Sequence, residues 1–496
     1  MMFYELQFLI PFFLFFLVYR KLNTQKQNIL IVVSSFYFYG LWDWRFLGLL
    51  ILQTVSDYFC ALIIAESKEK SIKKLVMYFS IAFNLGMLAT FKYANFFIDS
   101  FLTLFPYFGT PHSQKIIHFI LPPAISFYTF ESMSYVIDVY RGTAQAEKRF
   151  FSFAAFISFF PKLVAGPIER AHTLLAQINK KRVCTLDAFL SGVRLFMWGL
   201  FKKLVVAENM GALSEPMFSD PSKYDSLTLL FAAYCFTLQI YGDFSGYTDM
   251  ARGLSRMMGI ELSLNFNFPY FAKSLGDFWR RWHITLGTWL RDYIYIPLGG
   301  SKKGEFRHLT NLLITFFASG LWHGADWTFV LWGVFHGVFV AIEAFFNKRE
   351  TLSKFIEMVP SWVKVILTFH IVVLLWILFR SENIGIAVLY YKGLFGFLGF
   401  ENTKYFIYNI IHSKSFPDVF SFLITLFSPQ AWRLCVLFIV YGSLMMIVNS
   451  LQYAKANKEF DLAISVFYQS ILYSLIIAQL IMLGSQSAAQ FIYFQF

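Results

Sequence analysis

Long apolar runs alternate with short, mostly basic segments along nearly the whole chain. A helix needs about 20 predominantly apolar residues to cross a bilayer. Runs shorter than this are expected to be re-entrant or buried among other helices, where irregular backbone is tolerated at membrane depth. The pattern predicts an all-α, polytopic membrane protein with about nine to twelve crossings. The candidate runs are 5–19, 28–42, 45–65, 74–91, 95–107, 116–139, 188–207, 225–242, 309–322, 326–346, 362–379, 385–399, 432–451 and 463–483.

No Pro-, Ser- or Gly-rich linker interrupts this alternation, so residues 1–496 are expected to form a single membrane domain with a catalytic core at about 116–346. One segment departs from the plain spans. Residues 151–182 begin FSFAAFISFFPKLVAGPIER and contain Pro161 and Pro167, which break any long helix. A re-entrant or bent element is predicted there.

Residues 273–298 form a second unusual segment, KSLGDFWRRWHITLGTWLRDYIYIPL. Its tryptophans and leucines recur at helical spacing, while its arginines fall largely elsewhere. This predicts an amphipathic helix that lies at the membrane surface or in a basic inner mouth. Asp277 and Arg281 stand four residues apart and are expected to pair on it.

Composition supports the membrane interpretation, because 57% of residues are hydrophobic and only 15% are charged, against about 25% charged in soluble domains. The formal net charge of +12 sits in short loops between apolar runs, as in cytoplasmic loops of spanning proteins. No basic patch stands apart from apolar sequence, which argues against nucleic-acid binding. Arg20 and Lys21 directly follow the first run, so the N-terminus is expected outside and is not a signal peptide.

The four cysteines form no C-x-x-C pair, and no HExxH, EF-hand or dinucleotide motif occurs. We therefore expect no metal and no permanently bound cofactor. GGSKKG at 299–304 could place Lys302 and Lys303 against the phosphates of a nucleotide-like carrier, although it lacks P-loop spacing. A basic turn that obeys the positive-inside rule explains this segment equally well.

His323 is the first candidate for chemistry, because it lies between two apolar arms whose outer ends are both basic. Both basic ends prefer the cytoplasm, so the arms should form a hairpin with His323 at its tip, beside Ser319 and Trp322. The arm 309–322 would reach only about 21 Å, which keeps the imidazole inside the membrane domain. A neutral imidazole there could take a proton from an attacking hydroxyl. The alternative is a core histidine bonded to a backbone carbonyl.

His283 lies in WRRWH beside Arg281 and Trp282, and could orient the first histidine or polarise an acyl carbonyl. An interfacial structural role is the alternative. His336 is interpreted as a helix-packing contact. The histidines expected to be uninvolved are His112, His118, His172, His308, His370 and His412.

The stretch YGDFSGYTDMARGLSRMMGI, at 241–260, follows the apolar run that ends near Ile240. Asp243 and Ser245 could line the site as part of a hydrogen-bonded network. Ser245 could also be a nucleophile, but the local sequence supplies no general base for it.

Five blocks taken together resemble the membrane-bound O-acyltransferase family, in the branch that includes the membrane subunits of alginate and peptidoglycan O-acetylation. The likeness covers roughly residues 1–380, and the terminal FIYFQF also looks familiar. The blocks are ILPPAISFYTFESMSYVIDVYRG, FFPKLVAGPIER, YGDFSGYTDMARGLSRMMGI, LNFNFPYFAKSLGDFWRRWHITLGTWLRDYIYIPLGG and SGLWHGADWTFVLWGVFHG.

The resemblance implies that His323 is essential to transfer, that His283 lies near it, and that tilted helices form a ring around a thinned centre. It also implies a bacterial inner-membrane location and a cytoplasmic thioester donor, with acetyl-CoA expected. A secreted or membrane-anchored esterase-like partner would then place the acyl group on a sugar hydroxyl. Two alternatives stay open, namely D-alanyl transfer for teichoic acid modification and a transporter or flippase. The expected site-lining residues are Asp243, Ser245, Arg281, Trp282, Ser319 and Trp322.

Overall fold

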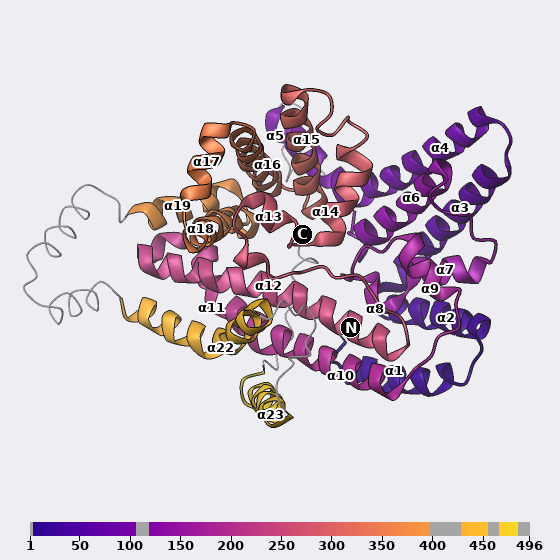
Figure 1. The fold of residues 1–496 in the computed structure, drawn as a ribbon, viewed down its shortest axis with the longest axis horizontal. Helices are drawn as coiled ribbons and strands as arrows, with labels where there is room; N and C mark the ends of the chain where they lie inside the picture. Colours follow the sequence, from indigo (N-terminus) through magenta and orange to yellow (C-terminus); the bar gives the residue numbers. More distant parts are fainter. Residues whose placement is uncertain (1–2, 106–118, 397–427, 455–465, 485–496) are drawn as a thin grey trace, which may run out of the picture. The chain divides into compact units, whose positions relative to one another are not determined.

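The computed structural model describes residues 3–105, 119–396, 428–454 and 466–484 (Figure 1). Every regular element in these ranges is a helix, so the all-α prediction is confirmed. His112, His118, His412 and the terminal FIYFQF lie outside the described residues. Within the described part, six helical stretches are long and apolar enough to cross a membrane: Thr24–Glu66, Lys70–Leu104, Ser226–Met257, Trp327–Asn347, Ser361–Arg380 and Pro429–Ala454.

The chain divides into two compact units. The first comprises Met1–Leu200, Tyr247–Asn265 and Ile284–Tyr293, and the second comprises Phe201–Gly246, Phe266–His283 and Ile294–Phe496. Every residue that the sequence predicts for the site belongs to the second unit.

Buried polar side chains join the helices of the first unit. The Asp57 carboxylate of α3 accepts hydrogen bonds from Ser80 of α4 (2.6 Å) and Ser132 of α6 (2.5 Å). Such satisfied groups make specific contacts between helices in an apolar setting. The elements of this unit are α1 (Leu6–Tyr19), α2 (Thr24–Asp43), η1 (Trp44–Phe46), α3 (Leu47–Glu66), α4 (Lys70–Leu88), η2 (Ala89–Tyr93), α5 (Ala94–Leu104), α6 (Ile125–Arg141), α7 (Phe150–Ser158), α8 (Phe160–Leu163), η4 (Ala171–Leu175), α9 (Ala176–Ile178), α10 (Leu186–Phe201) and α14 (Ile284–Leu290).

The bent element predicted at 151–182 is confirmed. Helix α7 stops at Ser158, the short α8 follows, and residues 164–170 are not helical. Lys162 of α8 forms a buried ion pair with Glu131 of α6, so the break places a cation beside a buried carboxylate.

Two helix predictions differ from the structure around the second unit. The run 225–242 is part of α12 (Ser226–Met257), whose 32 residues continue through the polar stretch because its polar side chains find buried partners. Residues 273–298 are not one amphipathic helix but α13 (Leu275–Trp279), α14 and η8 (Arg291–Tyr295). The remaining elements are η5 (Lys202–Ala207), α11 (Glu208–Ser219), η6 (Pro221–Lys223), η7 (Pro269–Phe271), α15 (Glu305–His323), α16 (Trp327–Asn347), α17 (Glu350–Met358), α18 (Ser361–Arg380), α19 (Ile384–Phe395), α22 (Pro429–Ala454) and α23 (Val466–Leu483).

The hairpin predicted around His323 is confirmed, with α15 and α16 as its arms. Asp326 caps the second arm, since its carboxylate accepts the backbone N–H of Thr328 at 2.8 Å. The first arm is longer than expected: its 19 residues reach about 28 Å. The imidazole is buried because the arms pack closely around it, not because the first arm is short.

Two glycines set the distance between these arms. A Cβ at Gly320 would overlap the carbonyl oxygen of Phe329, and one at Gly333 would overlap that of Phe316. Small residues allow helix backbones to approach this closely in membranes.

Gly333→Ala is therefore expected to destabilise the protein by about 1–3 kcal/mol, because backbone must shift to admit the methyl group. Thermal unfolding in detergent measures the effect. Gly86→Ala on α4 is the control, since a Cβ there meets no described atom within 4 Å. Equal stability of the two variants would contradict the close approach.

Candidate active site

His323 is the last residue of α15 and is 3% exposed. Aromatic rings surround the imidazole, with ring-centroid distances of 5.0 Å to Trp322, 5.0 Å to Trp332 and 5.4 Å to Phe379. These rings come from both arms of the hairpin and from α18. The histidine therefore lies in a rigid, largely apolar environment in which electrostatic interactions are strong.

His283 is the second imidazole of the site, and its ring centroid lies 6.4 Å from that of His323. Trp322 contacts both rings, at 5.6 Å from His283 and 5.0 Å from His323. Burial lowers the pKa of His283 to about 3, so this imidazole is neutral near neutral pH. A group that reaches His323 is thus also close to the neutral imidazole of His283.

The backbone at His283 is held in the left-handed region, with φ of +41°. This conformation is uncommon outside glycine and concentrates at functional sites. It occurs where α13 has ended and α14 has not begun, which explains why the predicted continuous helix is broken here.

Several buried polar groups near the histidines have no hydrogen-bond partner among the described residues. They are Ser319 Oγ and the indole nitrogens of Trp282, Trp332 and Trp376. An unsatisfied buried donor typically costs about 1–3 kcal/mol. Substrate oxygens in this region would satisfy such donors, and donors aimed at a developing oxyanion stabilise acyl transfer.

A compact charged cluster lies in the same unit as the histidines. Lys203 Nζ contacts Asp243 Oδ1 and Glu208 Oε1, each at 2.7 Å, and all three side chains are 4% exposed. Lys202 Nζ donates to Ser245 Oγ at 3.0 Å. Both lysines belong to η5, a π-helical segment of the kind often found at functional sites.

The cluster explains the predicted roles of Asp243 and Ser245. Ser245 donates its own proton to the carbonyl oxygen of Tyr241 at 2.6 Å and accepts from Lys202. A network role therefore describes Ser245 better than a nucleophilic one. Between these two residues, Phe244 contacts the His283 ring at 4.6 Å, so α12 carries the charged cluster up to the histidine.

Lys202, Lys203 and Glu208 are absent from the predicted site. Their signal is visible in the sequence, since two adjacent lysines interrupt the run 188–207. Ionisable residues within an apolar segment are functional candidates by default.

Three predicted residues, Arg281, Lys302 and Lys303, have other contacts or positions in the second unit. Arg281 pairs with Asp277 at 2.9 Å, as expected, and also donates to the carbonyl oxygen of Asn267. Lys302 and Lys303 precede α15, whereas His323 ends it, so the helix length separates them. His336 accepts a hydrogen bond from the Trp279 indole at 3.2 Å, which fits its predicted packing role. Within the described residues, no group of three or more His, Cys, Asp or Glu side chains could hold a metal.

Comparison with known proteins identifies the kind of protein to which this site belongs. Residues 146–387 match the model of the membrane-bound O-acyltransferase family. A protein named probable alginate O-acetylase AlgI, from Azotobacter vinelandii, is 40% identical over 391 residues, covering 77% of this chain and 76% of that protein. The chain belongs to the membrane-bound O-acyltransferase family.

Two further relatives are named for different transfer reactions. The peptidoglycan O-acetyltransferase of Helicobacter pylori is 33% identical over 433 residues, covering 80% of this chain and 81% of that protein. The teichoic acid D-alanyltransferase of Streptococcus thermophilus is 27% identical over 319 residues, covering 58% and 75%. The chain is thus a multi-pass membrane O-acyltransferase, and both candidate histidines lie within the matched region.

Proposed function

We propose that this enzyme moves an acetyl group from cytoplasmic acetyl-CoA through the membrane for O-acetylation of a cell-envelope polysaccharide. The observation that carries the proposal is the pair of buried imidazoles, 6.4 Å apart, inside a tryptophan-lined part of a membrane acyltransferase. The acetylating relatives are 33–40% identical and cover more of the chain than the D-alanyl relative does.

In the proposed step, His323 takes the proton of the acceptor hydroxyl as its oxygen attacks the thioester carbonyl. The new C–O ester bond forms, the C–S bond breaks, and the proton passes to the leaving thiolate. In the same step, neutral His283 and the buried indole N–H groups stabilise the oxyanion.

The same proposal includes the membrane location of the enzyme, its contact with the donor and its partner protein. The enzyme lies in a bacterial inner membrane with its N-terminus outside, and Lys302 and Lys303 meet donor phosphates on the cytoplasmic side. A secreted or membrane-anchored esterase-like protein then moves the acetyl group from this first acceptor to a sugar hydroxyl of the polymer.

The test consists of one assay with purified enzyme and a separate comparison of cells. Enzyme in lipid vesicles is given acetyl-CoA or a D-alanyl carrier-protein thioester, and free thiol is measured. Wall and exported polysaccharides from cells with and without the gene are compared by mass spectrometry. We expect thiol release from acetyl-CoA and loss of acetyl esters in cells lacking the gene. Release from the D-alanyl donor alone, or transport without thioester cleavage, would overturn the proposal.

A further inference from the structure

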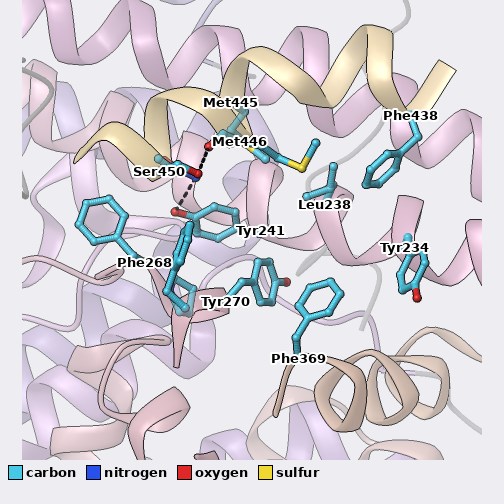
Figure 2. A pocket seen from close by; sticks show the side chains of 13 residues that line it. Tyr234, Leu238, Tyr241, Phe268, Tyr270, Phe369, Phe438, Met445, Met446 and Ser450 are labelled. Carbon is cyan, nitrogen blue, oxygen red and sulfur yellow. Dashed lines mark hydrogen bonds between the residues drawn. The ribbon is translucent and has the colours of Figure 1, made fainter. Parts of the chain in front are cut away.

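A half-open pocket lies in the second unit between α12, α18 and α22, and none of its lining residues is a histidine of the candidate site. It encloses about 220 Å³. Figure 2 shows Tyr241 and Tyr270 on one side, Met446 of α22 across from them, and Phe369 of α18 at the edge. The surface offered to an occupant is almost entirely aromatic rings and methionine.

The polar atoms around this pocket are already engaged. The Tyr234 hydroxyl and His370 Nε2 lie 2.8 Å apart, and His370 Nδ1 lies 2.8 Å from the Ile366 carbonyl oxygen. Because a carbonyl oxygen can only accept a hydrogen bond, His370 donates to it from Nδ1. Its Nε2 then accepts a hydrogen bond from the Tyr234 hydroxyl. The other bonds are Tyr270 to Thr237 O (2.8 Å), Ser450 to Met446 O (2.8 Å) and Asn449 to the Tyr241 hydroxyl (3.5 Å).

A sugar or a nucleotide would need several polar groups directed at it, whereas these side chains direct theirs at the protein. An apolar cavity of this kind also excludes water. The walls therefore favour a hydrocarbon occupant, which gains dispersion contacts with the rings and thioethers.

The three helices around the pocket are all candidate membrane spans. Apolar side chains on their outer surfaces are exposed, with Leu367 of α18 at 57%, Ile439 of α22 at 54% and Ile447 of α22 at 56%. In a bilayer these surfaces meet lipid tails, and Met446, which lines the pocket, is itself 37% exposed on the same helix. We propose that the pocket is a binding site for one hydrocarbon chain of a bilayer lipid.

The bound hydrocarbon chain packs against aromatic residues that adjoin the candidate active site. Tyr241 and Tyr270 contact Trp282 with ring centroids 6.3 Å and 6.1 Å apart. Trp282 directly precedes His283, so the lipid chain contacts two tyrosines that pack against the neighbour of this histidine.

The test is photolabelling of the full-length protein. Vesicles of phosphatidylethanolamine and phosphatidylglycerol receive a small fraction of phosphatidylcholine with a diazirine in its acyl chain, and labelled residues are located by mass spectrometry after irradiation. We expect labels to concentrate on pocket residues of α12 and α22. Met446→Trp, which fills the pocket, should reduce these labels several-fold.

Ile447→Trp is the matched control, since it places the same side chain on the outer face of the same helix and should leave pocket labelling unchanged. Ser450→Phe fills the pocket from another position if Met446→Trp does not fold. Equal labelling of a folded filling variant and the control would overturn the proposal. A wild-type label pattern confined to outward residues such as Ile439 would overturn it as well. Neither readout requires acyl transfer, so the proposed function is tested separately.

Discussion

Replacing His323 with alanine is expected to reduce thiol release from acetyl-CoA by about 100- to 10,000-fold, the range for loss of a general base. The imidazole is 3% exposed and wedged between Trp322, Trp332 and Phe379, where bulk water cannot easily replace it as proton acceptor. Loss of the ring also leaves a small cavity, so the folded fraction must be measured beside the rate.

His308→Ala supplies the matched control, because it removes an imidazole from the first turn of the same helix. It should retain wild-type transfer. His283→Asn separates the second histidine's chemistry from its backbone, since asparagine tolerates the left-handed conformation that residue 283 adopts. This variant should fold normally and lose less activity than His323→Ala. A folded His323→Ala protein with wild-type thiol release would exclude the general-base role.

The hairpin that carries His323 could be predicted from the sequence because it depends on a local pattern. Basic segments flank two apolar arms, and both prefer the same side of the membrane. Asp326 follows the histidine closely and caps the second arm, so sequence neighbours alone largely determine this turn. The histidine's contacts with Phe379 of α18, in contrast, depend on packing between distant segments.

The break at His283 could not be predicted from periodicity, because the tryptophans of 273–298 do follow helical spacing. In the structure Trp282 is fully buried and contacts Trp376 at 5.0 Å. The next residue, His283, has the left-handed backbone conformation, which a continuous α-helix cannot contain. Tertiary contacts here outweigh local helix preference.

The charged cluster shows a similar limit. Asp243 is conspicuous in the sequence as a carboxylate within an apolar setting, but its partner Lys203 is 40 residues earlier, as 243 − 203 gives. The lysine's position in a π-helical segment directs it at α12, and no short-range pattern specifies that geometry. With one ammonium between two carboxylates, the cluster's stability depends on the lysine more than on either acid alone.

Lys203→Met is accordingly expected to destabilise the protein by about 3–5 kcal/mol, the range for breaking a buried ion pair from one side. Asp243 and Glu208 are both 4% exposed, so the variant leaves two negative groups close together in a low-dielectric region. Thermal and denaturant unfolding in detergent measure the loss. Lys223→Met is the control in the same unit, because Lys223 pairs with Asp220 while 73% exposed. Such an exposed pair contributes about 0–1 kcal/mol.

A rescue variant distinguishes lost charge balance from lost packing. Adding Asp243→Asn and Glu208→Gln to Lys203→Met removes all three charges while nearly preserving side-chain volume, and should restore much of the stability. If the triple variant is as unstable as Lys203→Met alone, lost packing and not lost charge balance causes the instability. If Lys203→Met is no less stable than Lys223→Met, the buried ammonium does not hold the two carboxylates together.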